Sequence, residues 1–350
     1  MMRQKPRSAL RRLGPACALA VLAAIGLAPR AGHAACAHWR KIDIGVAVTP
    51  PNVVHTVPYI AQALGMFAKY CIKPHIIQFD GGDSPAAVAA VTQGTAISML
   101  SEVPIERGMH AKLIWGMVPV LPMSYYVSAG IKTAADLKGK RLSAAGGGVG
   151  GLNWLIGRAV LQSAGLTVHD ATFIASTTAG RLPGLVAGQV DGVVLHPEDG
   201  YLAHKANPGL HPLVKLSKLL PDWQFNSYGA SDAFIAKHFK LLRDTVAAMM
   251  DAARAIYTEP AKVIPIMVKA TGKPRAAVEF AWKEETGDCI WAVNTGLDPK
   301  RIEWTHRYDM ANHDAPAGKA LAFGQIVDTR LVAAALAEAG GPVNIHGCHS

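Results

Sequence analysis

Short apolar strands alternate with helices along the chain, and this alternation constrains the fold more than any other feature. Runs of apolar residues bounded by turn residues predict strands, and the longer runs between them predict helices. The predicted order begins with a strand at 41–49, a helix at 57–70, a strand at 73–83, a helix at 84–94 and a strand at 96–100, with further strands at 112–120 and 124–130. This order indicates an α/β fold with a largely parallel sheet.

The alternation starts again at residue 132 and makes a second α/β block. A glycine-rich stretch, "SAAGGGVGGLN" at 143–153, lies between a strand and a helix of this block. The block continues with a strand at 170–177 and the segment "GRLPGLVAGQVDGVVL", which predicts a helix followed by a strand. From about 231 to 338 the sequence is mainly helical. Two lobes are the natural expectation for a chain too long for one ordinary core.

The first 34 residues have the features of an export signal. A basic start precedes an almost wholly apolar run at 16–28, and Gly32-His33-Ala34 supplies small residues at the two positions that a signal peptidase reads. We expect cleavage near Ala34, with Ala35 as the alternative, and a periplasmic location. Arg11-Arg12 leaves a twin-arginine signal open, and Cys36 leaves a lipoprotein acceptor open, although His33 stands where a lipobox has Leu.

Most of the positive charge belongs to this export signal. The segment has six Lys and Arg residues and no acid, so its removal lowers the formal net charge from +10 to +4. The sequence contains no RNP, zinc-finger or basic-helix pattern, and we expect no nucleic acid partner. No later apolar stretch is long enough to span a bilayer.

Four cysteines remain after cleavage, and an even number in an exported chain indicates disulfides. Of the three possible pairings we favour Cys36–Cys348 with Cys71–Cys289, and free buried thiols are the alternative. The tail "IHGCHS" at 345–350 contains possible metal ligands, but no further ligands stand at a recognisable spacing. We therefore expect a frayed terminus and no metal site.

The glycines at 146, 148 and 151 spell GxGxxG, which suggests a dinucleotide site. Such a site needs an acid at the end of the next strand, and that strand ends in Ser176-Thr177-Thr178. A Walker A lysine, a G-x-S-x-G elbow and an H-E-x-x-H helix are also absent from the sequence. We therefore expect no cofactor and no enzymatic activity.

Residues 132–195 also carry a family resemblance. "TAADLKGKRLSAA" followed by "LIGRAVLQSAGL" and "GRLPGLVAGQVDGVVLHPE" resembles the middle of periplasmic solute-binding proteins of ABC importers. The subgroup is the nitrate/sulfonate/taurine-type and pyrimidine-precursor-type receptors, and the resemblance covers roughly 41–290.

The resemblance implies a two-lobed type II periplasmic-binding-protein fold with a ligand cleft between the lobes and a helical C-terminal part. Lobe one would combine 35–125 with 228–350, and lobe two would be 126–227. Hinge segments near 124–128 and 224–230 would allow closure around the ligand. The resemblance further implies a monomer whose partners are a small-molecule ligand and a membrane permease.

Ligands of open α/β sheets bind beyond the carboxyl ends of the strands, so the candidate ligand contacts come from those ends. Arg181 could hold an acid group with its bidentate fork, and a solvated helix-start arginine is the alternative. His55 could donate a hydrogen bond, and it would carry charge if its pKa were raised. Backbone N–H groups of the glycine stretch at a helix start would favour an anion, or its glycines serve only a tight turn. The full candidate set is Thr49, Asn52, His55, Gly82, Ser101, Gly147, Gly148, Val149, Asn153, Thr177, Arg181 and His196.

These residues lead to three functional hypotheses. The first is a periplasmic receptor that delivers a small organic anion, such as a sulfonate, a taurine-like compound or an aromatic carboxylate, to an ABC importer. The second is the same fold binding a neutral pyrimidine or thiamine precursor, for which Glu102, Glu198 and the aromatic residues Tyr125, Tyr126, Trp223 and Tyr228 would matter more than Arg181. The third is an exported enzyme or a sensor-kinase ligand receptor.

Overall fold

The fold is given by a computed structural model that describes residues 36–81, 84–318 and 321–350. Residues Cys36–Ser350 form one unit by their internal contacts. The predicted export signal at 1–34 and the candidate Gly82 lie outside the described residues. Among the described residues, none of the helices has the length and apolar character that crossing a bilayer requires.

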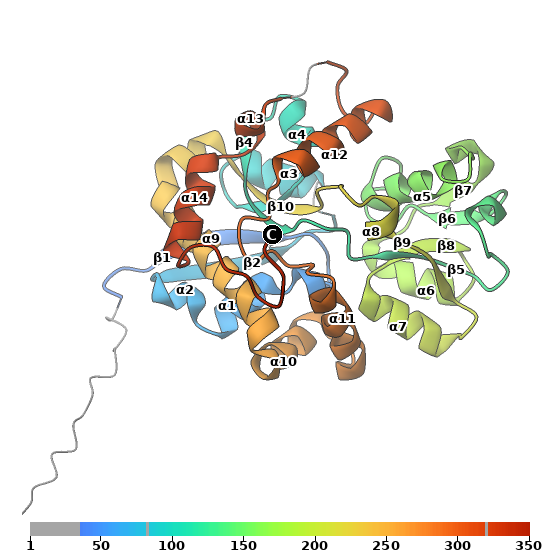
Figure 1. The fold of residues 1–350 in the computed structure, drawn as a ribbon, viewed down its shortest axis with the longest axis horizontal. Helices are drawn as coiled ribbons and strands as arrows, with labels where there is room; N and C mark the ends of the chain where they lie inside the picture. Colours follow the sequence, from blue (N-terminus) through green and yellow to red (C-terminus); the bar gives the residue numbers. More distant parts are fainter. Residues whose placement is uncertain (1–35, 82–83, 319–320) are drawn as a thin grey trace, which may run out of the picture. The chain divides into compact units, whose positions relative to one another are not determined.

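The strands of the described residues form sheets of two, three and five strands (Figure 1). β1 pairs with β2, β10 lies between β3 and β4, and the third sheet has the order β7-β6-β8-β5-β9. A bridge between Ile44 and Ile97 links the two smaller sheets. We call β1–β4 with β10 the first sheet region and β5–β9 the second sheet. The strands are β1 (Arg40–Val46), β2 (Ile72–Gln78), β3 (Ser98–Leu100), β4 (Ala111–Val118), β5 (Ser124–Val127), β6 (Arg141–Ser143), β7 (Thr172–Ile174), β8 (Gly192–Leu195), β9 (His211–Lys215) and β10 (Asn226–Ser231).

The expectation of a largely parallel sheet is wrong for two strands. β1 with β2, and β6 with β7 and β8, are parallel, as the strand–helix alternation predicts. β5 runs antiparallel to β8 and β9, and β10 runs antiparallel to β3 and β4. β5 and β10 are the strands through which the chain enters the second sheet and returns to the first sheet region, so no helical crossover fixes their direction.

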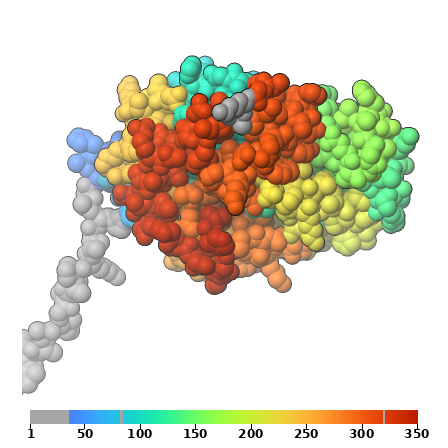
Figure 2. All heavy atoms as spheres, turned by 45° about the horizontal axis from the view of Figure 1, so that its top comes forward, coloured from blue at the N-terminus to red at the C-terminus, as the bar shows by residue number. Residues whose placement is uncertain are grey.

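Helices flank both groups of strands, and the C-terminal part is helical, as predicted (Figure 1). The C-terminal residues, drawn in orange and red, make up a large part of the face shown in Figure 2. The helices are α1 (Val57–Ala63), α2 (Met66–Lys69), α3 (Pro85–Thr92), α4 (Val103–Glu106), α5 (Leu152–Gln162), α6 (Arg181–Val186), α7 (Pro197–Ala206), α8 (Leu216–Leu219), α9 (Asp232–Thr258), α10 (Pro260–Thr271), α11 (Arg275–Gly287), α12 (Pro299–Ala311), α13 (Phe323–Ile326) and α14 (Thr329–Glu338).

Local sequence signals explain where several helices begin and end. The Ser84 hydroxyl accepts a hydrogen bond from Ala87 N at 3.3 Å and caps α3. Ser231 caps α9 in the same way through Phe234 N. The helix expected over 57–70 is interrupted at Gly65, whose φ of 72° lies in the left-handed region, so α1 and α2 are separate.

The core includes most of the aromatic residues near the predicted hinge. Tyr125 and Tyr228 are fully buried, and Trp223 is 7% exposed. Tyr228 stacks on Trp115 with ring centroids 6.3 Å apart. Packing in the core therefore accounts for these three of the four aromatic residues considered as ligand contacts.

The predicted disulfide pairing is wrong. Cys36 bonds Cys71, and Cys289 bonds Cys348. The first pair follows from the sheet register, because parallel β1 and β2 align Arg40 with Ile72 and bring the residues that precede both strands together. The second pair follows from the tail, which Asn294 holds through the carbonyls of Val343 and His349.

Candidate functional site

The first sheet region contacts the second sheet through a set of buried polar side chains. Asn52, in the loop after β1, donates from Nδ2 to Glu198 Oε1 at 2.8 Å and to Asp199 Oδ2 at 3.3 Å. Val53 N donates to the same Glu198 oxygen at 3.1 Å. Glu198 and Asp199 stand in the first turn of α7, where the helix dipole favours negative charge.

Two cationic side chains complete this set. Lys273 forms an ion pair with Asp199, and the two side chains are 16% and 8% exposed. Arg181, at the start of α6, donates from Nη2 to Asn52 Oδ1 at 3.2 Å and from Nε to Thr178 O at 3.1 Å. We call Asn52, Arg181, Glu198, Asp199 and Lys273 the inter-sheet cluster.

Arg181 is only 5% exposed, so the solvated alternative for this residue is wrong. Burial lowers the pKa of Arg181, and the nearby carboxylates of Asp199 and Glu198 oppose that shift. The guanidinium nevertheless stays protonated, because the ordinary arginine pKa is far above neutrality.

A cavity of about 130 Å³ lies beside the inter-sheet cluster. Arg181 and Lys273 bring two positive charges to its wall, and Asp199 brings one negative charge. This volume is small beside the several hundred Å³ of a typical ligand pocket, so it suits a small polar group. The lining residues are Thr49, Pro50, Asn52, Thr178, Ala179, Arg181, Leu182, Pro183, Asp199 and Lys273.

Two buried histidines, His55 and His196, lie next to the cluster with their ring centroids 5.5 Å apart. Burial and the Arg181 charge lower the pKa of His55 to about 3. His55 Nε2 is 2.6 Å from the side-chain nitrogen of Asn226, so Nε2 accepts from that amide. Burial also holds the pKa of His196 well below its usual value, with a further contribution from Arg181. Both rings are neutral at neutral pH, because the raised pKa that a charged His55 would need is not found.

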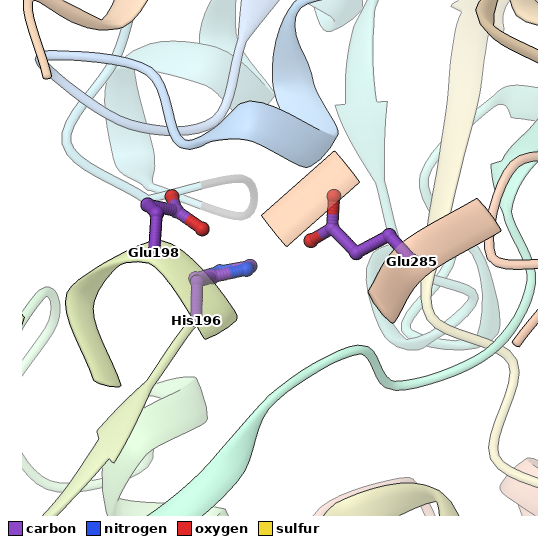
Figure 3. A group of neighbouring side chains, drawn as sticks. All are labelled: His196, Glu198 and Glu285. Atoms are coloured by element: carbon purple, nitrogen blue, oxygen red, sulfur yellow. The ribbon is translucent and has the colours of Figure 1, made fainter. Parts of the chain in front are cut away.

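Glu285 of α11 joins His196 and Glu198 in a second cluster, which we call the buried triad (Figure 3). One ligand atom from each residue lies within 4.8 Å of the other two, and all three residues are at most 2% exposed. Burial raises the pKa of Glu285 well above its usual range, and the Glu198 charge adds to the shift. Burial and Asp199 likewise raise the pKa of Glu198.

The structure brings some of the predicted contacts together and separates others. Thr49, Asn52 and Arg181 line the cavity, and His55 and His196 are buried beside it. Thr177 is exposed and precedes a short 3-10 turn, and Ser101 lies just before the start of α4.

The backbone groups of the glycine stretch that were predicted to bind an anion lie ahead of the helix start. Gly147, Gly148 and Val149 precede α5, which begins at Leu152, and the Val149 side chain is 75% exposed. Asn153 braces this loop, since its Nδ2 donates to Ala145 O at 2.9 Å. The four glycines at 146, 147, 148 and 150 all have positive φ, so the stretch is a chain of tight turns that only glycine adopts readily.

Sequence reasoning missed Lys273 and Glu285. Lys273 follows Gly272, a left-handed residue that ends α10, and nothing in the local pattern connects it with α7. Glu285 stands on the apolar face of α11 beside Ala277, Val278 and Ala281, all buried. An acid on an apolar helix face is the one signal that marks Glu285, because buried carboxylates are rare without a partner.

Comparisons with known proteins agree with this architecture. Residues 52–263 match the family described as "NMT1/THI5 like". The search of curated protein sequences returned no match.

Three solved structures show the fold. The alkanesulfonate-binding protein SsuA from Xanthomonas axonopodis pv. citri, bound to MOPS, has 18% identity and a TM-score of 0.64, covering 86% of this chain and 99% of that one. The periplasmic nitrate-binding protein NrtA from Synechocystis PCC 6803 has 12% identity and a TM-score of 0.66, covering 86% and 89%. A mutant of DSZB in complex with biphenyl-2-sulfinic acid has 16% identity and a TM-score of 0.60, covering 85% and 99%.

At these identities the solved structures establish the fold alone, and the family match extends over more than half of the chain. The chain therefore belongs to the NMT1/THI5-like family and has the α/β type II fold of periplasmic binding proteins.

Proposed function

We propose that this chain is the periplasmic solute-binding component of an ABC importer and that its ligand is a small organic anion. The observation that carries the proposal is the cavity beside the inter-sheet cluster, where Arg181 and Lys273 outnumber the single acid Asp199. A sulfonate, a taurine-like compound or an aromatic carboxylate would accept hydrogen bonds from the guanidinium of Arg181. SsuA and NrtA, which share the fold, bind an alkanesulfonate and nitrate.

The ligand would lie between two lobes, the first at 35–125 with 228–350 and the second at 126–227. Two crossings of the chain support this division. β5 enters the second sheet at Ser124, and β10 returns to the first sheet region at Asn226. Hinge motion near 124–128 and 224–230 would open the cavity to solvent and close it around the solute. A monomer with a membrane permease as its partner completes the proposal.

Binding without turnover is favoured over catalysis, although the desulfurization enzyme DSZB shares the fold. The four cysteines of residues 36–350 are paired in disulfides, so a thiol nucleophile is lacking in the part of the chain that the structure describes.

A neutral pyrimidine or thiamine precursor is a second candidate, and the raised pKa values of Glu198 and Glu285 favour it. A protonated carboxyl group both donates and accepts hydrogen bonds, which suits the edge of a pyrimidine ring. An anion would instead depend on the guanidinium of Arg181.

A thermal-shift screen followed by calorimetric titration separates these candidates. The panel comprises nitrate, alkanesulfonates, taurine, aromatic carboxylates and a neutral pyrimidine, and mass spectrometry checks each mixture for turnover. For an anion, Arg181→Gln should weaken binding by about 1.5–3 kcal/mol, the contribution of a charge-assisted hydrogen bond. The matched control is Arg141→Gln, because Arg141 also bonds a carboxylate, that of Asp191, but its side chain is 46% exposed. Stabilisation by the pyrimidine alone would remove the anion from the proposal, and product formation would identify an enzyme.

A further inference from the structure

The buried triad leaves several polar atoms without a partner. His196 Nδ1, Glu198 Oε2 and both carboxylate oxygens of Glu285 have no hydrogen-bond partner among the described residues. Their side chains point toward one another from the end of β8, the first turn of α7 and the last turn of α11 (Figure 3). Buried polar groups in folded proteins are almost always satisfied, so three such side chains converging on one point require an explanation.

We propose that the buried triad binds one divalent metal ion of the Zn²⁺ type, held by His196, Glu198 and Glu285. The donor set is one imidazole and two carboxylates, which suits zinc and its first-row neighbours. Two carboxylates also balance the charge of a divalent cation. The inference is independent of the anion proposed above, because none of the triad residues lines the 130 Å³ cavity, but it competes with the neutral pyrimidine for Glu198 and Glu285.

The distances between the donor atoms of the triad are consistent with a single small ion. Bonds of about 2.1 Å to one tetrahedral ion place the ligand atoms roughly 3.4 Å apart. The atoms of the triad lie within 4.8 Å of one another, so a rotation of these side chains that closes the gaps by at most about 1.4 Å completes the site.

The surroundings of Glu198 already select the oxygen that faces the ion. Oε1 accepts hydrogen bonds from Asn52 Nδ2 and Val53 N, at 2.8 and 3.1 Å. These contacts orient the carboxylate and leave Oε2 without a hydrogen-bond partner among the described residues, so Oε2 is available to the ion.

The triad also connects separate parts of the fold. His196 and Glu198 follow β8 of the second sheet, whereas Glu285 belongs to α11 in the C-terminal helical part. A bound ion would hold α11 against α7, and it would stabilise the arrangement in which the first sheet region and the second sheet are in contact.

Zinc binding tests the inference with Zn²⁺ as the probe and no solute present. The purified protein is stripped with a chelator and titrated against a chromophoric zinc indicator. We expect one ion per chain, with Glu285→Gln and His196→Gln each weakening the affinity at least about tenfold. Glu284→Gln is the matched control, since Glu284 is the exposed neighbour of Glu285 on α11. His346→Ala with His349→Ala controls for binding at the histidine-containing tail.

X-ray absorption at the zinc edge of the wild-type protein provides a readout that does not depend on any variant. A shell of one imidazole with oxygen ligands and no sulfur is expected. The inference is overturned if the wild-type protein binds no zinc, if the tail variant abolishes binding that Glu285→Gln retains, or if the shell contains two or more imidazoles. Because the solute screen is run on zinc-free protein, a failure of the anion proposal leaves the zinc inference intact, and a failure of the zinc inference leaves the anion proposal intact.

Discussion

The ion pair between Asp199 and Lys273 joins α7 to the loop after α10, and its removal tests whether the two parts of the fold are in contact in solution. Lys273→Met keeps most of the side-chain volume and removes the charge. Asp199 then stays 8% exposed with one remaining partner, Asn52 Nδ2 at 3.3 Å. Breaking one side of a buried pair costs about 3–5 kcal/mol, because the other charge is left desolvated.

A double-mutant cycle isolates the pair from other effects of the substitution. Asp199→Asn removes the unpaired charge, so the double variant should be more stable than Lys273→Met alone by about 1–3 kcal/mol. Lys262→Met is the control, because Lys262 pairs with Glu259 on α10 at 66% and 37% exposure, where a loss of no more than about 1 kcal/mol is expected.

Urea denaturation followed by tryptophan fluorescence measures the free energy of unfolding of each variant. The slope of the unfolding free energy against urea concentration must be equal among the variants, so that a shifted midpoint reports a change in stability alone. If Lys273→Met lowers the free energy of unfolding by less than about 1 kcal/mol, the reasoning is refuted, because a loss that small is typical of a solvated ion pair in an open cleft.

Two further predictions concern the first sheet region and the tail. Replacing Cys289 and Cys348 by Ala opens a cross-link with a sequence separation of 59, and the free energy of unfolding should fall by about 4 kcal/mol, measured by urea denaturation without reductant. Asp244 accepts hydrogen bonds from Arg40 and Arg243 that outweigh burial and lower its pKa. Asp244→Asn should therefore cost about 1–3 kcal/mol at neutral pH. Because the folded pKa lies below the unfolded value of about 3.9, this difference should persist above pH 4 and vanish as the pH falls through the folded pKa.

The fold was largely predictable, because strands and helices leave periodic patterns that packing preserves. The α/β class, the helical C-terminal part and the cap at Ser84 follow from such local signals. The antiparallel direction of β5 and β10 could not be predicted from the sequence, because a strand has the same apolar pattern whether its neighbours run parallel or antiparallel to it. The disulfide pairing did not follow either, because it depends on the register of β1 with β2, which aligns residues far apart in the chain.

The candidate site was predictable only where a strand end marks it. Asn52, Arg181 and His196 stand near the ends of β1, β7 and β8, and rules for open sheets point to such positions. Lys273 and Glu285 come from the helical part, whose residues meet the site only through tertiary packing. The charge of His55 could not be predicted, because burial, which the sequence does not reveal, decides its pKa.

The central position of β10 between β3 and β4 governs the order in which the chain can fold. β3 and β4 are complete at Val118, but the strand that joins them begins only at Asn226. At roughly 5–20 residues per second of synthesis, the first sheet region lacks its middle strand for about 5 to 20 s. Its edges stay unpaired for that time, and an unfinished sheet of this kind keeps the nascent chain unfolded. A chain that must thread through a narrow translocation channel before it folds would benefit from this delay.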